Sequence, residues 1–345
     1  MQPHDDQPSN TRSVRDRPAA PLPSWREVVG YVVLASGLCW LVVAPAMLGF
    51  IDTDVAPALV PVAQLTPLLS ALVFLRVLRP GRARDLLALR WNRSGRWAAT
   101  GVGVLMVIGV AQLVSGLLLG WRPRPTAEIL TAASVVLPFL VLQAAFAVGE
   151  ETGWRGWLLS RTRHLGFPAA AAISAGAWTL WHLPALTFLP DPVSAESAAY
   201  LLGIASWAPF LVALRLVSGS VWPPVLVHGA INSVRVFLLQ SVADSGGVDW
   251  RIEVLGWVLW LLAAVLLARH GHMGGLADPR ARARSVWGTA HPSSTSRVDN
   301  PGVTGPWQES HQTGEHVDTD PPRGSLTAPP FIMFGAKSHL KGVAQ

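Results

Sequence analysis

Three short patterns place ionisable and amide side chains inside stretches that are otherwise apolar. The pattern EETGWR begins with two adjacent acids, Glu150 and Glu151, directly after a hydrophobic run. Of ten histidines, only His182 and His228 fall within hydrophobic runs, and Asn232 is the asparagine that does so. Polar groups buried within apolar segments are costly, so they usually face a cavity or one another. A carboxylate, two imidazoles and an amide from three segments therefore predict a shared hydrolytic centre.

The spacing around the two acids predicts different directions for their side chains. Glu151 and Arg155 are four residues apart, so they can pair on one face of a helix. Glu150 lies about 100° round the helix from its neighbour, so it can point elsewhere, into the bundle. Gly149 and Gly153 form a small-xxx-small pair, which lets another helix approach the glutamates closely. Taken alone, the Glu151–Arg155 pair is more often structural than catalytic.

The two histidines carry the same four-residue spacing to a neighbour. His228 and Asn232 would fall on one stripe of a helix. Trp178 and His182 share this offset, so an aromatic wall would flank that imidazole. A single histidine or asparagine inside a membrane is commonly an interhelical hydrogen-bond partner. The combination of these groups on three segments favours the hydrolytic centre.

The composition of the chain indicates an integral membrane protein. Half of the 345 residues are hydrophobic, 14% are charged, and the mean hydropathy is +0.37. The net charge of +6 does not indicate a nucleic-acid partner, because the arginines lie in short segments between apolar runs. The single cysteine, Cys39, lies inside an apolar run, so the sequence contains no disulfide framework.

Eight apolar runs are long enough to cross about 30 Å of hydrocarbon. They cover residues 28–50, 55–78, 97–120, 129–150, 168–189, 198–217, 221–241 and 252–268. Prolines interrupt several of these runs, which membrane helices tolerate better than soluble helices do. The predicted fold is therefore all-α, a polytopic membrane bundle of about eight transmembrane helices.

The distribution of arginine predicts the orientation of this bundle. The segment between the second and third runs carries Arg76, Arg79, Arg82, Arg84, Arg90, Arg93 and Arg96. Further arginines follow the fourth, sixth and eighth runs, whereas the alternate loops are rich in acids. The loop with Arg122 and Arg124 is an exception to this pattern. Positive-inside counting places both termini in the cytoplasm.

Composition also divides the chain into three parts. Residues 1–27 are polar, and we expect a disordered N-terminal arm. Residues 28–269 hold the apolar runs and form the predicted transmembrane domain. Residues 270–345 are rich in Pro, Ser, Thr, Gly and His, so we expect a disordered C-terminal tail that cannot bury enough apolar surface to fold.

The three patterns together resemble the motifs of the CPBP family of intramembrane proteases. That family includes the Ras-converting CAAX endopeptidase and bacteriocin-processing, Abi-like relatives. Its motifs are EExxxR, then an aromatic residue four before a histidine, then HxxxN or HxxxD. Trp178 stands where the family usually has Phe, a mild departure. The resemblance covers about residues 130–240 and leaves the first three runs and the tail untested.

This resemblance implies a role for each motif residue. Glu150 would be the base that polarises water, helped by His182. His228 and Asn232 would donate hydrogen bonds to the developing oxyanion. The supporting residues would be Glu151, Arg155 and Trp178. The reaction would be the hydrolysis of a peptide bond in a membrane-associated or lipidated protein or peptide.

The sequence leaves the cofactor open. Glu150, His182 and His228 could supply three ligands to zinc with an open position for water. The chain contains no HExxH pattern, and a metal-free glutamate mechanism is equally compatible with the same residues. The expected partners are membrane lipids and the peptide substrate. The expected location is the cell membrane, as a multi-pass protein.

Two other classes of function use similar residues. A catalytically silent membrane scaffold or immunity factor could keep the same fold, although retained site residues would then be unexpected. A proton-coupled transporter could relay protons through the same acids and histidines. The sequence shows no internal pseudo-repeat and no matching pair of broken runs in two halves, which disfavours the transporter.

Overall fold

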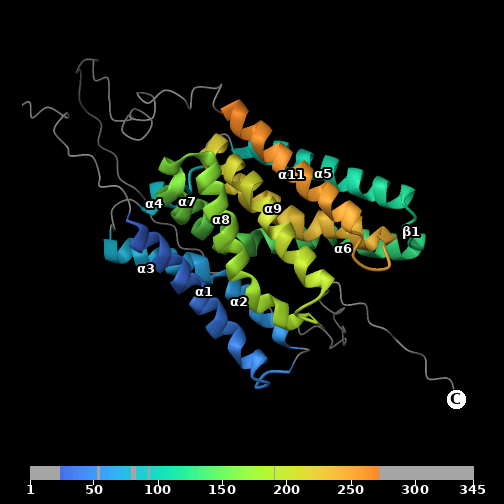
Figure 1. The fold of residues 1–345 in the computed structure, drawn as a ribbon, viewed down its shortest axis with the longest axis horizontal. Helices are drawn as coiled ribbons and strands as arrows, with labels where there is room; N and C mark the ends of the chain where they lie inside the picture. Colours follow the sequence, from blue (N-terminus) through green and yellow to red (C-terminus); the bar gives the residue numbers. More distant parts are fainter. Residues whose placement is uncertain (1–23, 53–54, 79–82, 92–93, 190, 272–345) are drawn as a thin grey trace, which may run out of the picture. The chain divides into compact units, whose positions relative to one another are not determined.

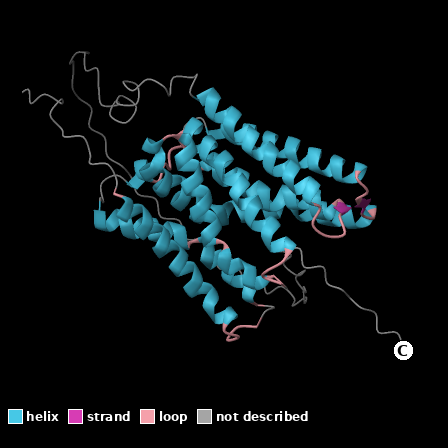
Figure 2. Cartoon of the chain, viewed as in Figure 1, coloured by secondary structure: helices cyan, strands magenta, loops and turns pink. Residues whose placement is uncertain are grey.

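Figure 1 shows a computed structural model of the chain, which describes residues 24–52, 55–78, 83–91, 94–189 and 191–271. Nearly all of the predicted N-terminal arm and C-terminal tail lie outside these residues. The chain divides into two compact units, Met1–Ala268 and Arg269–Gln345, and the helices below belong almost entirely to the first. Helices make up most of the described chain, as Figure 2 shows. The prediction of an all-α membrane bundle is therefore confirmed at the level of fold class.

The helices differ widely in length. The longer ones are α1 (Trp25–Met47), α3 (Thr66–Leu78), α5 (Ser94–Leu118), α6 (Thr126–Glu151), α8 (Phe167–Trp181), α9 (Ala195–Ser218) and α11 (Trp250–Gly271). The shorter ones are α2 (Val60–Gln64), α4 (Ala83–Leu86), α7 (Leu159–Thr162) and α10 (Trp222–Ala230). The π-helices are η4 (Thr152–Leu158), η7 (Ile231–Arg235) and η8 (Phe237–Ser241). The 3₁₀ helices are η2 (Ala56–Leu59), η5 (Arg163–Leu165) and η6 (Leu183–Phe188).

Within the described residues, five helical stretches are long and apolar enough to cross a membrane. They are α1, α5, α9, α11 and the stretch Thr126–Leu165 that begins with α6. They correspond to the predicted runs 28–50, 97–120, 129–150, 198–217 and 252–268. The remaining predicted runs, 55–78, 168–189 and 221–241, contain shorter or broken helices, so the count of eight spans stays a prediction.

Prolines and π-turns account for these interruptions. In the run 55–78, α2 ends at Gln64 and α3 begins at Thr66, directly before Pro67. Proline lacks the backbone N–H of a helix interior and clashes with the preceding turn. In the run 168–189, Pro184 lies in the 3₁₀ helix that follows α8. In the run 221–241, α10 continues into π-helices rather than as a single α-helix.

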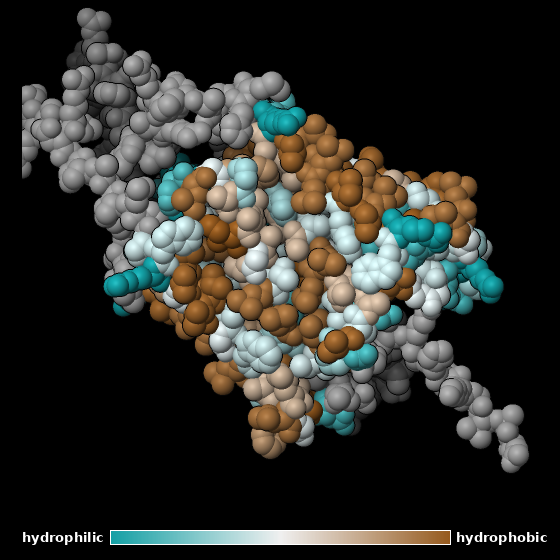
Figure 3. Space-filling model, in the orientation of Figure 1, coloured by the Kyte–Doolittle hydropathy of each residue, from teal (hydrophilic) through white to brown (hydrophobic). Residues whose placement is uncertain are grey.

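Apolar side chains cover the outside of the bundle. Figure 3 shows hydrophobic residues spread over the face in view. On α6 the large exposed side chains are Leu130, Val135, Leu137 and Val141. Soluble proteins rarely expose continuous apolar surface of this kind, and a helix in contact with lipid does so by necessity.

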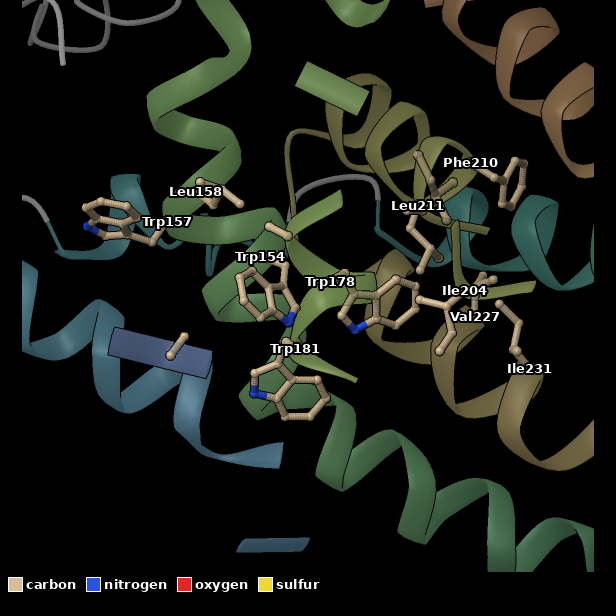
Figure 4. Close-up of a cluster of buried hydrophobic side chains, with 14 of the residues drawn as sticks. Trp154, Trp157, Leu158, Trp178, Trp181, Ile204, Phe210, Leu211, Val227 and Ile231 are labelled. Atoms are coloured by element: carbon tan, nitrogen blue, oxygen red, sulfur yellow. The ribbon is translucent and has the colours of Figure 1, made fainter. Parts of the chain in front are cut away.

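Tryptophans form much of the core beside the predicted site. Trp154, Trp157, Trp178 and Trp181 are all buried, and Figure 4 shows them among aliphatic side chains from other helices. Tyr31 of α1 stacks on Trp157 with ring centroids 4.4 Å apart. Aromatic packing of this kind fixes neighbouring helices closely and is worth more than its buried area alone.

Two glycines allow α2 and α3 to lie against the end of α6. A Cβ atom added at Gly149 would collide with the carbonyl oxygen of Gln64. At Gly153, it would lie 2.5 Å from Cβ of Pro67 and from the hydroxyl of Tyr31. The close approach predicted from the Gly149–Gly153 spacing is therefore observed.

The loops that follow α5 and η8 are joined by a short ladder. Strand β1 (Arg122–Pro123) pairs antiparallel with β2 (Ala243–Asp244). Trp121 Nε1 also donates a hydrogen bond to Asp249 Oδ2 at 3.2 Å. Hydrogen bonds from the Arg251 side chain to both carboxylate oxygens hold the pKa of Asp249 down at about 2.

Candidate active site

The two adjacent glutamates end α6 and are both buried, with 1% and 0% of their surface exposed. The chain continues from them into the π-helix η4, which contains Arg155. π-helical turns are rare and often occur at functional sites. A buried carboxylate is costly unless it is paired or hydrogen-bonded, so the partners of Glu150 and Glu151 decide what each can do.

Glu151 is held by Arg155 and His228. Arg155 donates from its terminal nitrogen to Glu151 Oε1 at 2.8 Å, and both side chains are fully buried. His228 Nδ1 lies 2.9 Å from the same oxygen, and since a carboxylate only accepts, the imidazole is the donor. The predicted Glu151–Arg155 pair is present, and Glu151 also orients His228, which spacing alone did not indicate.

Glu150 is held mainly by neutral donors. Gln64 Nε2 donates to its Oε1 at 2.8 Å, and Trp178 Nε1 donates to its Oε2 at 2.6 Å. His228 Nε2 lies 3.9 Å from Glu150 Oε1. Within the described residues no arginine or lysine forms an ion pair with Glu150, in contrast to Glu151.

The ring of Trp178 contacts Arg155 and both histidines. Its ring faces the guanidinium of Arg155 at 4.2 Å, a cation–π distance. Its ring centroid is 5.3 Å from that of His182 and 5.2 Å from that of His228. The tryptophan thus provides the predicted aromatic wall, and its indole N–H adds a hydrogen bond that phenylalanine could not make.

His182 lies at the end of α8, where the helix gives way to η6. Its Nδ1 is 2.8 Å from the carbonyl oxygen of Trp178, so this nitrogen carries the proton and Nε2 is an acceptor in the neutral ring. Trp181 and Tyr200 also contact the ring, with centroids 4.7 and 5.8 Å away. Within the described residues His182 forms no hydrogen bond to Glu150.

Asn232 lies in the π-helix η7 and contacts a residue that the motifs do not include. Its Nδ2 donates to Gln143 Oε1 at 3.2 Å, and Gln143 is buried on α6 two turns before Glu150. In the described part of the chain, Asn232 is hydrogen-bonded neither to His228 nor to Glu150. Because η7 is a π-helix, residues four apart need not lie on the same face. The shared face predicted for His228 and Asn232 therefore does not follow from their spacing.

Sequence reasoning missed the two glutamines of the site, Gln64 and Gln143. The same signal that singled out Asn232 was present for both, because each is a neutral amide inside an apolar run. Gln112 fits this description too, yet it donates to the carbonyl oxygen of Ile252 and ties α5 to α11. The signal therefore finds buried amides without telling which of them belong to the site.

The zinc site considered from the sequence stays a prediction. Among the described residues, no group of three or more His, Cys, Asp or Glu side chains is arranged to hold a metal ion. We therefore derive no step through a metal held by Glu150, His182 and His228.

Residues 131–234 match the family model of the type II CAAX prenyl endopeptidases, Rce1-like. The matched segment contains both glutamates, both histidines and Asn232, so the resemblance stated from the motifs is confirmed. The match supports protease activity in a membrane at the level of the family. No curated protein matches the chain.

Replacement of Arg155 tests whether its buried ion pair with Glu151 stabilises the fold. Arg155→Met keeps the length of the side chain but leaves a buried carboxylate without its counter-charge, and breaking such a pair costs about 3–5 kcal/mol. We expect a fall of this size in the unfolding free energy in detergent, measured by chemical denaturation.

Arg90→Met is the matched control. Its ion pair with Asp85 has the same 2.8 Å distance but is exposed, with 67% and 59% of the two side chains accessible. An exposed pair contributes about 0–1 kcal/mol, so this variant should unfold nearly as the wild type does. Equal losses in the two variants would contradict the assignment of Arg155.

Proposed function

We propose that the protein is an intramembrane endopeptidase in which Glu150 activates the attacking water. The observation that carries the proposal is the division between the two glutamates. Glu151 is neutralised by Arg155, whereas Glu150 is held by the neutral donors Gln64 and Trp178. Because no arginine or lysine pairs with it among the described residues, Glu150 is the carboxylate of the two that can exchange a proton with water, as a general base must.

The proposed reaction proceeds in two proton-coupled steps. Glu150 takes a proton from water while the water oxygen bonds to the peptide carbonyl carbon, and the carbonyl electron pair moves onto its oxygen. The proton then passes from Glu150 to the amide nitrogen as the C–N bond breaks. The products are a carboxylic acid and an amine, and the carboxylate of Glu150 is regenerated. His182 supports the first step, because its Nε2 can accept a hydrogen bond from the second proton of the water.

The proposed oxyanion donors are His228 and Asn232. His228 lies between the two carboxylates, 2.9 Å from Glu151 and 3.9 Å from Glu150. A protonated imidazole there balances negative charge and donates from both nitrogens. Asn232 Nδ2 has a second N–H besides the one that bonds to Gln143. Donors placed before the reaction stabilise the developing charge without reorganisation.

The proposed substrate is a membrane-associated or lipidated protein or peptide, and the proposed location is the cell membrane. The matching family model is described as CAAX prenyl endopeptidase, and the apolar exterior of the bundle suits a substrate that is held in lipid. No metal is assigned to the reaction. A silent scaffold and a proton-coupled transporter are the competing functions, and both predict that no peptide bond is cleaved.

We also propose that eight segments cross the membrane and that both termini are cytoplasmic. The asymmetry of arginine between alternate loops supports this orientation. Reporter fusions after residues 86 and 270 should both be active with a cytoplasmic reporter and inactive with a reporter that works only outside. Activity of the outside reporter at either position would reject the orientation.

Cleavage by the purified protein in lipid vesicles tests the proposed base. The probes are two fluorogenic peptides of identical sequence, one with a farnesylated cysteine near its C-terminus and one without. The wild type should cleave at least one of them, and Glu150→Gln should reduce the rate at least about 100-fold, as expected for loss of a general base. If the wild type cleaves only the farnesylated peptide, a prenylated substrate is supported.

Glu128→Gln is the control on the same helix. Glu128 lies in the first turn of α6, far along the helix from the site, and it is exposed in its salt bridge to the half-buried Arg124. This variant should cleave at the wild-type rate. Normal cleavage by Glu150→Gln would refute the base, and cleavage of neither peptide by the wild type would favour the scaffold or the transporter.

A further inference from the structure

Gln64 touches Glu150 from a part of the chain that the family match does not reach. It is the last residue of α2, just before the interruption between α2 and α3. The matched segment begins at residue 131, so neither the three motifs nor the family assigns any role to Gln64. Its side chain is buried, with 5% of the residue exposed.

The hydrogen bond from Gln64 has one possible direction. Its amide nitrogen is 2.8 Å from Glu150 Oε1, and an ionised carboxylate can only accept. Bonds from neutral N–H groups to a carboxylate are stronger than bonds between neutral groups and favour the ionised form. Gln64 and Trp178 occupy different oxygens of Glu150, so together they fix the plane of the carboxylate.

The backbone around Gln64 is held at several points. The carbonyl oxygen of Gln64 packs directly against Gly149, where any side chain would collide with it. Thr66 accepts a hydrogen bond from Trp181 Nε1 at 2.9 Å, and Tyr31 donates to the carbonyl of Pro67 at 3.1 Å. Contacts with α1, α6 and α8 therefore hold the backbone between α2 and α3 in place.

We propose that Gln64 is a positioning residue for the reaction, which holds the carboxylate of Glu150 ionised and correctly oriented toward the attacking water. The proposal rests on the proposed function, because it assigns Gln64 to the base of that reaction. Gln64 acts through Glu150 and does not touch the substrate. Its loss should therefore lower kcat while KM stays nearly unchanged.

The test compares Gln64→Met with Gln112→Met. Methionine keeps a similar length and volume but cannot donate a hydrogen bond. Gln112 is buried to a similar extent, and its Nε2 donates at 2.9 Å to the carbonyl of Ile252, outside the site. Both variants remove a buried amide from an apolar region. A general effect of that removal should therefore change the thermal stability in detergent of both variants.

Kinetics with the fluorogenic peptide that the wild type cleaves provide the first readout. We expect kcat to fall about 10- to 100-fold in Gln64→Met, the range that corresponds to one hydrogen bond to a charged group. Gln112→Met should keep the wild-type kcat. Combining Gln64→Met with Trp178→Phe should give a non-additive loss, because both residues hold one carboxylate, whereas Gln112→Met with Trp178→Phe should be additive.

Labelling of Glu150 by dicyclohexylcarbodiimide provides a second readout that needs no substrate. This apolar reagent modifies protonated carboxyl groups, and mass spectrometry locates the modified residue. Loss of the donor should raise the labelling of Glu150 several-fold in Gln64→Met and leave it unchanged in Gln112→Met. Unchanged labelling in Gln64→Met, or an equal loss of kcat in both variants, would overturn the proposal. Increased labelling in a protein that cleaves no peptide would reject the protease function while leaving the contact established.

Discussion

The structure depends on the burial of two adjacent carboxylates at the end of an apolar helix. Desolvation of even one such group costs several kcal/mol unless other groups compensate. Here the compensation comes from different parts of the chain, since Gln64 lies on α2, Arg155 on η4, Trp178 on α8 and His228 on α10. The requirement to satisfy Glu150 and Glu151 therefore fixes how these helices meet.

Several irregular features of the fold allow these helices to contact one another. The glycines before and after the acids permit the backbone of α2 and α3 to approach α6, which brings Gln64 within hydrogen-bond distance of Glu150. The interruption before Pro67 ends α2 at that glutamine. The end of α8 at Trp181 leaves His182 at a helix terminus, beside Trp178 and Tyr200. Interruptions of this kind are tolerated in a membrane where other protein groups satisfy the freed backbone.

The division of labour between the acids has a chemical consequence. Glu151 accepts from Arg155 and His228 through the same oxygen, so its charge is committed to structure. Glu150 accepts from an amide and an indole, which orient it without neutralising it. Two carboxylates in different surroundings can take different roles, as they do in enzymes that use paired acids.

The sequence predicted the motif residues because charge inside an apolar run is rare and therefore informative. The Glu151–Arg155 pair followed from helical spacing, and the membrane class followed from composition. The sequence could not predict that Trp178 donates to Glu150 or that His228 binds Glu151, because those contacts depend on helix packing. Gln64 and Gln143 were overlooked because, unlike Asn232, neither lies four residues from one of the two histidines in the apolar runs. The unbroken runs 55–78, 168–189 and 221–241 were expected from hydropathy, which does not register where proline or a π-turn interrupts a helix.

The unfolding free energies of Glu150→Gln and Glu151→Gln in detergent test the central claim most directly. The claim is that Glu151 stabilises the fold as the counter-charge of Arg155, whereas Glu150 is the proposed general base. Glu151→Gln leaves Arg155 buried without a counter-charge and should lose about 3–5 kcal/mol. Glu150→Gln removes a buried charge that has no arginine partner among the described residues, so its stability should stay within about 1 kcal/mol of the wild type. Equal losses, or a larger loss for Glu150→Gln, would contradict the account.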